Sequence, residues 1–512
     1  MHLIPILLAL ALLPGLATEA AAQASRPNIL LVITDDQSYP HASAYGSRFV
    51  ETPTFDRVAR EGVLFTRAYV ASPGCSPSRA ALLTGRYPWQ IEQAGTHASS
   101  FPAKYVVIPD LLEQTGYRVG YTGKGWGPGD WESSGRPRNP AGPAFNDARL
   151  PAPVDGMSAV DYAANFREFL RQRPGGAPFF FWYGASEPHR RYAPGSGRAA
   201  GKRLEEVEVP AYLPDTPEVR SDLLDYALEI EHADRQLGRM LELLEEMGEL
   251  DNTLVIVTAD NGMPFPRAKA TVYDAGIHVP LAVRWPARIP GGRVVEDLVS
   301  LIDLTPTLLE AAGVEHPGTH PMSGRSVLGL LASRASGIVE PTRDAVFAGR
   351  ERHSSARWNN LGYPQRAIRT RDHLYIRNFA PERWPAGAPR RYEEDGTLGP
   401  MHGGYADIDP GPTLDLLTSG AGDPHLDSYL YLAVARQPAE ELYDLRTDPD
   451  CLHNLAADPA YAVVTREHRE RLEARLRETG DPRVLGNGDV WESYERLEGP
   501  MRRFPTPEWA LP

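Results

Sequence analysis

Residues 75–86 of the chain read Cys-Ser-Pro-Ser-Arg-Ala-Ala-Leu-Leu-Thr-Gly-Arg. Pro77 suits the first turn of a helix, where its missing N–H costs nothing, and Gly85 is a natural C-terminal stop. The residues between them include good helix formers. The stretch therefore predicts a short helix with Cys75 at its electropositive N-terminal end, where a group that must carry negative charge is stabilised.

Three continuous apolar runs are typical of strands that are buried on both faces. They span residues 28–33, 178–183 and 253–257, and each one leads into polar residues. In open α/β sheets the ligand site lies beyond the carboxyl ends of such strands. Segments with helical patterns separate the strands, which predicts an α/β main domain; they cover residues 54–61, 109–114, 219–247 and 304–312.

Two of the strand ends carry oxygen ligands for a metal ion. Asp35 and Asp36 follow the first run, and Asp260 and Asn261 follow the last. Three carboxylates and an amide suit Ca²⁺ or Mg²⁺ better than zinc. Taken singly, each pair is equally compatible with a helix cap or a turn.

The string Cys-x-Pro-Ser-Arg followed by Thr-Gly resembles the signature of type I sulfatases, and the resemblance extends over nearly the whole mature chain. It implies an alkaline-phosphatase-like fold, with a large mixed sheet flanked by helices and a smaller C-terminal α+β domain. It also implies that a formylglycine-generating enzyme converts Cys75 to formylglycine, whose hydrate is the nucleophile. Residue 75 then joins Asp35, Asp36, Asp260 and Asn261 around the metal, for which we expect Ca²⁺ rather than Mg²⁺.

The same resemblance implies roles for four basic residues. Arg79 is expected to hold the formylglycine and the metal-site carboxylates, and Lys124 and Lys269 to bind sulfate. His189 is expected to be a sulfate ligand and the general acid for the leaving group. Without the motifs, each would be interpreted as an ordinary surface or core residue.

The chain departs from the sulfatase pattern at one position. Sulfatases usually have a histidine two residues after the lysine that matches Lys124, where this chain has Trp126. That histidine commonly assists collapse of the sulfated intermediate. His189 or His97 is a candidate to replace it.

Several stretches resemble the heparan N-sulfatase branch of the family, namely residues 187–190, 210–245 and 260–266. They indicate a sulfated saccharide substrate, with N-sulfoglucosamine of heparin or heparan sulfate favoured. Three alternatives stay open: an O-sulfatase acting on a glycan or aryl sulfate, a phosphate or phosphonate ester hydrolase of the same superfamily, and a non-catalytic glycan-binding protein in which Cys75 is never matured.

Residues 350–377 form a locally basic segment with seven arginines and two histidines against Glu351 and Asp372. These groups can pair with an otherwise acidic surface, or they can bind the sulfate or carboxylate of a saccharide. The sequence supports both interpretations about equally. Arg350 and His353 are the better substrate-binding candidates.

The length of 512 residues fits a large domain followed by a smaller one. We expect a signal peptide at 1–22, a catalytic domain at 23–360 and a C-terminal domain at 361–512. The last should contain strands at 367–376 and 441–444 and a helix at 464–479. Residues 125–153 and 380–422 have the composition of long loops, which are commonly functional.

The signal peptide predicts export to the periplasm or beyond, with no stable membrane anchor. A net charge of −14 argues against nucleic acid as a partner. The two cysteines, Cys75 and Cys451, could form one long-range disulfide. The motif around Cys75 favours an unpaired Cys451 and no disulfide.

Overall fold

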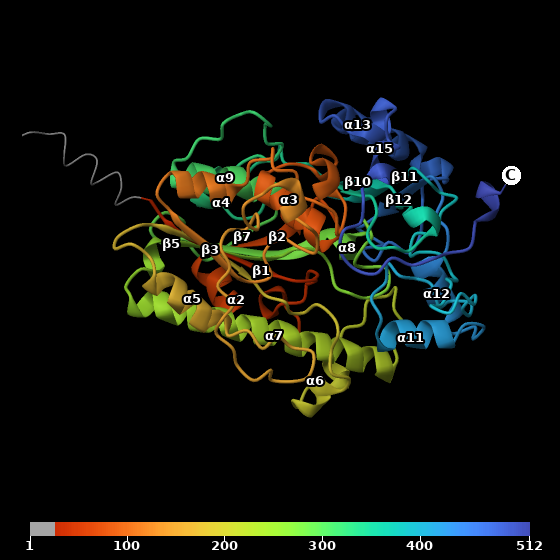
Figure 1. Ribbon diagram of the computed structural model, residues 1–512, viewed down its shortest axis with the longest axis horizontal. Coiled ribbons are helices and arrows are strands. Elements are labelled where there is room, and N and C mark those ends of the chain that lie inside the picture. Colours follow the sequence, from red (N-terminus) through yellow and green to blue (C-terminus); the bar gives the residue numbers. More distant parts are fainter. Residues whose placement is uncertain (1–25, 512) are drawn as a thin grey trace, which may run out of the picture.

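The computed structural model describes residues 26–511, so the expected signal peptide at 1–22 lies outside the described residues. Its main sheet has eight strands, and seven follow the order β3-β4-β1-β5-β6-β2-β7, with β8 paired to β2 (Figure 1). Four adjacent strands are mutually parallel: β3 (Arg118–Gly123), β4 (Phe179–Gly184), β1 (Asn28–Thr34) and β5 (Thr253–Ala259).

The other half of this sheet mixes strand directions. β6 (His278–Arg284) is antiparallel to both β5 and β2 (Val63–Tyr69). Two short strands, β7 (Arg293–Val295) and β8 (Val299–Ser300), then run parallel to β2. The expected large mixed sheet is therefore confirmed.

Helices cover both faces of the main sheet (Figure 1). On one side lie α3 (Cys75–Thr84), α4 (Ile108–Gln114) and α9 (Leu304–Ala312). On the other lie α2 (Pro53–Glu61), α5 (Tyr162–Arg171) and the long α7 (Pro217–Glu246). All the main-domain helices expected from the sequence are present, with bounds shifted by one or two residues.

Strand β1 shows why its sequence is apolar throughout. Ile29 and Leu31 pack into the core beneath α3, α4 and α9, whereas Leu30 and Val32 pack into the core beneath α2, α5 and α7. Because successive side chains of a strand point to opposite faces, a strand covered on both sides needs apolar residues at every position.

A second, antiparallel sheet forms the smaller C-terminal part, in the order β12-β11-β10-β9. Its strands are β9 (Ala345–Arg350), β10 (Gln365–Thr370), β11 (His373–Asn378) and β12 (Glu440–Asp444). Helix α13 (Ala462–Glu478) packs on it through Leu472 and Leu476. The sheet thus begins with β9, ahead of the expected boundary near residue 361, and that boundary stays a prediction.

Two local expectations in this part were wrong. Residues 367–376 are not one strand, because Arg371 and Asp372 turn the chain between β10 and β11. Residues 380–422 are not entirely loop, since they contain α11. The remaining helices are short: α6 (Ser196–Ala199), α8 (Asp274–Ile277), α10 (Leu328–Ala332), α11 (Pro412–Ser419), α12 (Asp427–Val434), α14 (Pro482–Leu485) and α15 (Val490–Ser493).

Within residues 26–511, no helix combines the length and apolar composition needed to cross a membrane. Cys75 and Cys451 are both buried and free, so the expectation of no disulfide is confirmed.

Candidate active site

The carboxyl ends of the four parallel strands bring the predicted residues together. The backbone N–H of Asp35 donates to the carbonyl of Glu187, that of Lys124 to Gly184, and that of Asp260 to Thr34, at 2.8–3.1 Å. The Lys124 and Asp260 bonds continue the strand pairing by one residue, and the Asp35 bond ties the end of β1 to the loop after β4. Polar side chains from β3, β1 and β5 therefore converge on one point, as parallel topology requires.

Asp35, Asp36 and Asp260 form a buried acidic cluster in which one oxygen of each lies within 4.8 Å of the others. Asn261 donates its Nδ2 to Asp36 at 2.7 Å, which leaves its Oδ1 free to act as a ligand. Asp35 Oδ1 and Asn261 Oδ1 are both buried without a hydrogen-bond partner among the described residues. Orphaned oxygens of this kind are costly unless a cation binds them, so the donor set fits a hard divalent ion.

Arg79 joins the helix of the opening motif to this cluster. Its side chain is completely buried, with Nε 2.7 Å from Asp260 Oδ2 and Nη1 donating to the carbonyls of Lys124 and Gly125. Burial disfavours the guanidinium, but Asp260 and Asp35 outweigh burial and raise the pKa of Arg79. Burial and the neighbouring Asp35 raise the pKa of Asp260 to about 6.

The two predicted lysines each contact one carboxylate of the cluster. Lys124 Nζ lies 2.6 Å from Asp35, and Lys269 Nζ lies 2.7 Å from Asp36. Burial alone would raise the pKa of Asp35, yet Lys124 and the other cations beside it lower that pKa below its usual range. Both ammonium groups stay charged, because the carboxylates raise their pKa values despite burial.

Cys75 is the first residue of α3, as the sequence predicted, and Gly85 ends that helix in the left-handed conformation. The Cys75 Sγ lies 3.8 Å from Asp36 Oδ1. Burial and the charge of Asp35 raise the pKa of the thiol, outweighing both lysines. The unmodified side chain is therefore a protonated thiol.

His189 reaches the cluster from the loop after β4. Its Nε2 lies 3.8 Å from Asp36 Oδ2, and its side chain is 38% exposed. Its Nδ1 lies 2.6 Å from the carbonyl of Arg190. Since a carbonyl can only accept, Nδ1 carries a hydrogen and Nε2 is the nitrogen that faces the site.

Trp126, which stands where a histidine was expected, supports the fold beside Cys75. It is buried edge-on against Phe101, and its Nε1 donates to the carbonyl of Ser76 at 3.0 Å. The indole therefore holds the first turn of the helix that carries Cys75. Among residues 26–511, neither its hydrogen bonds nor its aromatic contact reaches the acidic cluster.

His97 and His353 stack on each other with ring centroids 4.3 Å apart. A Cβ added to Gly74 would lie 3.0 Å from His353 Nδ1, so this ring adjoins the residue before Cys75. Burial lowers the pKa of both histidines, which keeps them neutral. Their position beside Cys75 is compatible with substrate contact, and the role of His97 in place of the missing histidine stays a prediction.

Most arginines of the basic segment pair with internal carboxylates. Arg366 contacts both Glu351 and Asp481, and Arg369 contacts Asp274. Arg350 contacts Asp407 and also lines a small cavity with Lys269. Pairing within the protein thus accounts for Arg366 and Arg369; Arg350 is paired in the same way, and its role as a substrate ligand stays a prediction.

Asp409 is the site residue that the sequence did not reveal. It accepts a hydrogen bond from Lys269 at 2.9 Å and groups with Asp36 and His189. Burial would raise the pKa of Asp409, but Lys269 and His189 lower it. The only signal was its place within residues 380–422, a long loop of the kind that often carries function.

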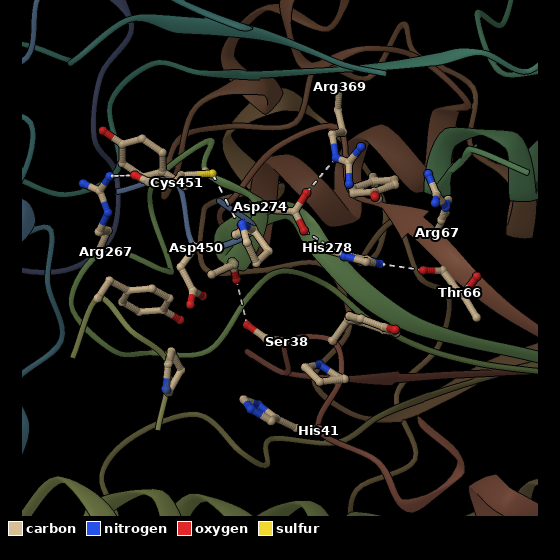
Figure 2. A pocket seen from close by; sticks show the side chains of 18 of the residues that line it. Ser38, His41, Thr66, Arg67, Arg267, Asp274, His278, Arg369, Asp450 and Cys451 are labelled. Atoms are coloured by element: carbon tan, nitrogen blue, oxygen red, sulfur yellow. Dashed lines mark hydrogen bonds and ion pairs between the residues drawn. The ribbon is translucent and has the colours of Figure 1, made fainter. Parts of the chain in front are cut away.

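A separate cavity of about 420 Å³ lies beside the chain that leaves β1. Figure 2 shows Asp274 in it, flanked by Arg369 and His278, with the sulfur of Cys451 close to Asp274. Asp274 lies 2.8 Å from Arg369 and 2.9 Å from His278, and these cations lower its pKa against the effect of burial. The Asp274–Arg369 pair connects the main domain to strand β10 of the smaller sheet.

The sequence model of the sulfatase family matches residues 27–314. The chain is 31% identical to human N-sulphoglucosamine sulphohydrolase, over 91% of this chain and 93% of that protein. It is 28% identical to an ulvan-active sulfatase of Formosa agariphila, over 91% of this chain and 77% of that protein.

Solved structures share the fold at lower sequence identity. One, bound to its substrate D-glucosamine-2-N,6-O-disulfate, has a TM-score of 0.63 at 21% identity and covers 90% of this chain and 99% of its own. The phosphonate monoester hydrolase of Agrobacterium radiobacter has a TM-score of 0.58 at 20% identity, covering 90% of this chain and 97% of its own. These likenesses confirm the alkaline-phosphatase-like architecture expected from the sequence.

Proposed function

This chain belongs to the sulfatase family and is a sulfatase hydrolase, and we propose that its substrate is N-sulfoglucosamine at an end of heparin or heparan sulfate. The observation that carries the proposal is the arrangement of Arg79, Lys124, Lys269 and His189 around three carboxylates and Cys75. A cationic pocket next to a nucleophile position suits a sulfuryl group, whose oxygens are all negatively polarised.

Similarity to relatives supports the substrate class. The relative that is 31% identical over 91% of the chain is named for N-sulphoglucosamine. A structural neighbour holds a glucosamine that is sulfated on nitrogen and on O6. We therefore place a sulfated glucosamine in this site, with the N-linked sulfate as the group removed.

A metal ion and a modified cysteine would complete the site. Asp35, Asp36, Asp260, Asn261 and residue 75 would hold Ca²⁺, which supplies positive charge for the sulfuryl oxygens. Oxidation of Cys75 by a formylglycine-generating enzyme would supply an aldehyde hydrate as nucleophile. The high pKa of the Cys75 thiol is compatible with a cysteine that is modified rather than used as a thiolate.

The remaining side chains have roles that follow from their positions. Lys124 and Lys269 bind the sulfuryl oxygens, while Arg79, wholly buried, orients Asp260 and the start of α3. His189 presents Nε2 to the site, where its protonated form donates a proton to the departing amine. Arg350 and His353 contact the sugar beyond the sulfate.

We further propose that the chain is exported through the segment at 1–22 and matured before use. The catalytic part is then 23–360, and the part from 361 onward completes the site by supplying Asp409.

The test combines mass spectrometry of the peptide that contains Cys75 with a sulfate-release assay. The substrates are N-sulfoglucosamine and glucosamine 6-sulfate, and Cys75→Ala is the inactive control. We expect the mass of formylglycine and release from the N-sulfated sugar. An unmodified thiol in active protein contradicts the nucleophile, and release only from glucosamine 6-sulfate makes the enzyme an O-sulfatase.

A further inference from the structure

A cavity of about 300 Å³ in the C-terminal part is walled by three tryptophans from separate segments. Trp358 begins the 3₁₀ turn η8 (Trp358–Asn360), Trp384 lies in the loop after β11, and Trp509 lies in η10 (Glu508–Ala510) near the C-terminus, labelled C in Figure 1. Trp358 and Trp509 meet edge to face at 6.0 Å. Trp509 remains 43% exposed, so its ring is available to a ligand.

The same cavity is lined mainly by basic side chains in a chain whose net charge is −14, although Arg357 and Arg383 are already paired with Asp407 and Glu492. Four arginines line it, and Glu508 is the one acidic residue among the described lining residues. The guanidinium of Arg436 lies 4.6 Å from the ring centre of Trp384, a cation–π distance. The other three are Arg357, Arg383 and Arg390.

Several of these donors are not used within the protein. Arg357 is 4% exposed. Its Nε donates to the carbonyl of Trp384, and its Nη2 donates to the carbonyl of Pro385 and to Asp407. Its buried Nη1 has no hydrogen-bond partner among residues 26–511. Arg390 makes one side-chain hydrogen bond to a described residue, from Nε to the carbonyl of Gly399. The side chain of Arg436 makes none. A buried guanidinium nitrogen without an acceptor is costly, which points to an anionic ligand.

One short stretch of chain links this cavity to the active site. Asp407 binds Arg357 at 2.8 Å, and Asp409, two residues later, binds Lys269 at 2.9 Å. Asp407 also lines the small cavity that contains Lys269. The Asp407–Arg357 ion pair therefore joins the wall of the basic cavity to the wall of the cavity beside Lys269.

We propose that this cavity is a second saccharide subsite, which binds a sulfated or carboxylated sugar unit of the chain whose terminal unit occupies the Cys75 site. Indole rings offer the flat apolar surface on which the C–H face of a sugar packs, and guanidinium groups bind sulfate and carboxylate in pairs of hydrogen bonds. This inference rests on the proposed function for the identity of the polymer.

The test compares a monosaccharide with an oligosaccharide. Trp509→Ala and Arg436→Gln change exposed side chains, so both variants should fold. We expect each to raise the KM for a heparin-derived tetrasaccharide with a terminal N-sulfoglucosamine about 5- to 20-fold, while the KM for free N-sulfoglucosamine stays within about 2-fold. Tyr431→Ala, 69% exposed, and Arg198→Gln, exposed on α6, are matched controls that should change neither value.

Calorimetric titration of Cys75→Ala protein with the tetrasaccharide separates the subsite from catalysis. Adding Trp509→Ala should weaken binding at least about 5-fold. Three results would overturn the subsite. The KM could rise equally for both substrates, it could stay unchanged for the tetrasaccharide, or it could rise as much in the two control variants. If neither sugar releases sulfate, the proposed function fails, and the titration alone decides whether the cavity binds the oligosaccharide.

Discussion

The ammonium of Lys269 lies 2.9 Å from a carboxylate oxygen of Asp409, a residue contributed by a loop 140 positions further along the chain. Lys269 also lies 2.7 Å from Asp36, so two carboxylates from separate parts of the fold fix one cation, which we propose binds the sulfate. The C-terminal part of the chain thus takes a direct part in forming the active site.

Replacing Asp409 by Asn should weaken substrate binding more than turnover. The amide keeps the shape but removes one of the two charges that hold Lys269, so the lysine loses its fixed position. We expect the KM for the sulfated sugar to rise about 10-fold, with a smaller change in kcat. Steady-state kinetics measure both values. Asp409→Glu should recover part of the loss, and Asp415→Asn, exposed on α11, should have no effect. An unchanged KM in Asp409→Asn contradicts this role.

The part of the site that the sequence predicted lies at the ends of buried strands. Asp35 and Asp260 follow apolar runs that can only be central strands, and parallel pairing then brings them together. The motif around Cys75 supplied the rest through its resemblance to a family. These residues were predictable because local patterns placed them at a known edge of the sheet.

The residues that were missed depend on contacts between distant segments. Asp409 follows no periodic pattern, and the partners of Arg366 and Arg369 are up to 115 positions away in the chain. The hairpin between β10 and β11 turns on Arg371 and Asp372, without the Gly or Asn that usually marks a tight turn. Tertiary packing, rather than local preference, decides all of these features.

Trp126→Phe should destabilise the protein without removing activity. The change deletes the hydrogen bond from Nε1 to the Ser76 carbonyl and leaves a small gap beside Phe101. We expect a loss of about 1–2 kcal/mol in the free energy of unfolding. Denaturant titration measures it, and the assay should retain most of the sulfate release. Loss of activity at unchanged stability would instead assign the indole a role in the reaction.

Removal of the metal should abolish activity while leaving the fold intact. Arg79, Lys124 and Lys269 each contact one of the three clustered carboxylates, so their repulsion is already balanced without an ion. We expect chelation to lower sulfate release at least about 100-fold and the Tm by only a few degrees.

Adding Ca²⁺ to the chelated protein should restore activity more fully than Mg²⁺, because the oxygen-rich set suits the larger ion. Thermal melting and sulfate release, measured on the same sample, separate the two effects. Full activity after exhaustive chelation contradicts the metal site.

Because of Glu229 on α7, the free energy of unfolding should fall as the pH rises. Burial, with Glu187 and Asp225 nearby, raises the pKa of Glu229 to about 9, so the folded protein binds a proton that the unfolded chain releases near its ordinary value of 4.5. This contribution to stability is fully present below about pH 4.5 and is lost as the pH rises toward 9. Glu229→Gln needs no proton and should be more stable than the parent, by about 3 kcal/mol at pH 7 and by more at pH 8. Denaturant titrations from pH 5 to 9 measure the difference, which should shrink toward pH 5. Glu242→Gln, exposed on the same helix, is the control, and equal pH profiles for parent and Glu229→Gln would show that the carboxyl is already ionised in the folded state.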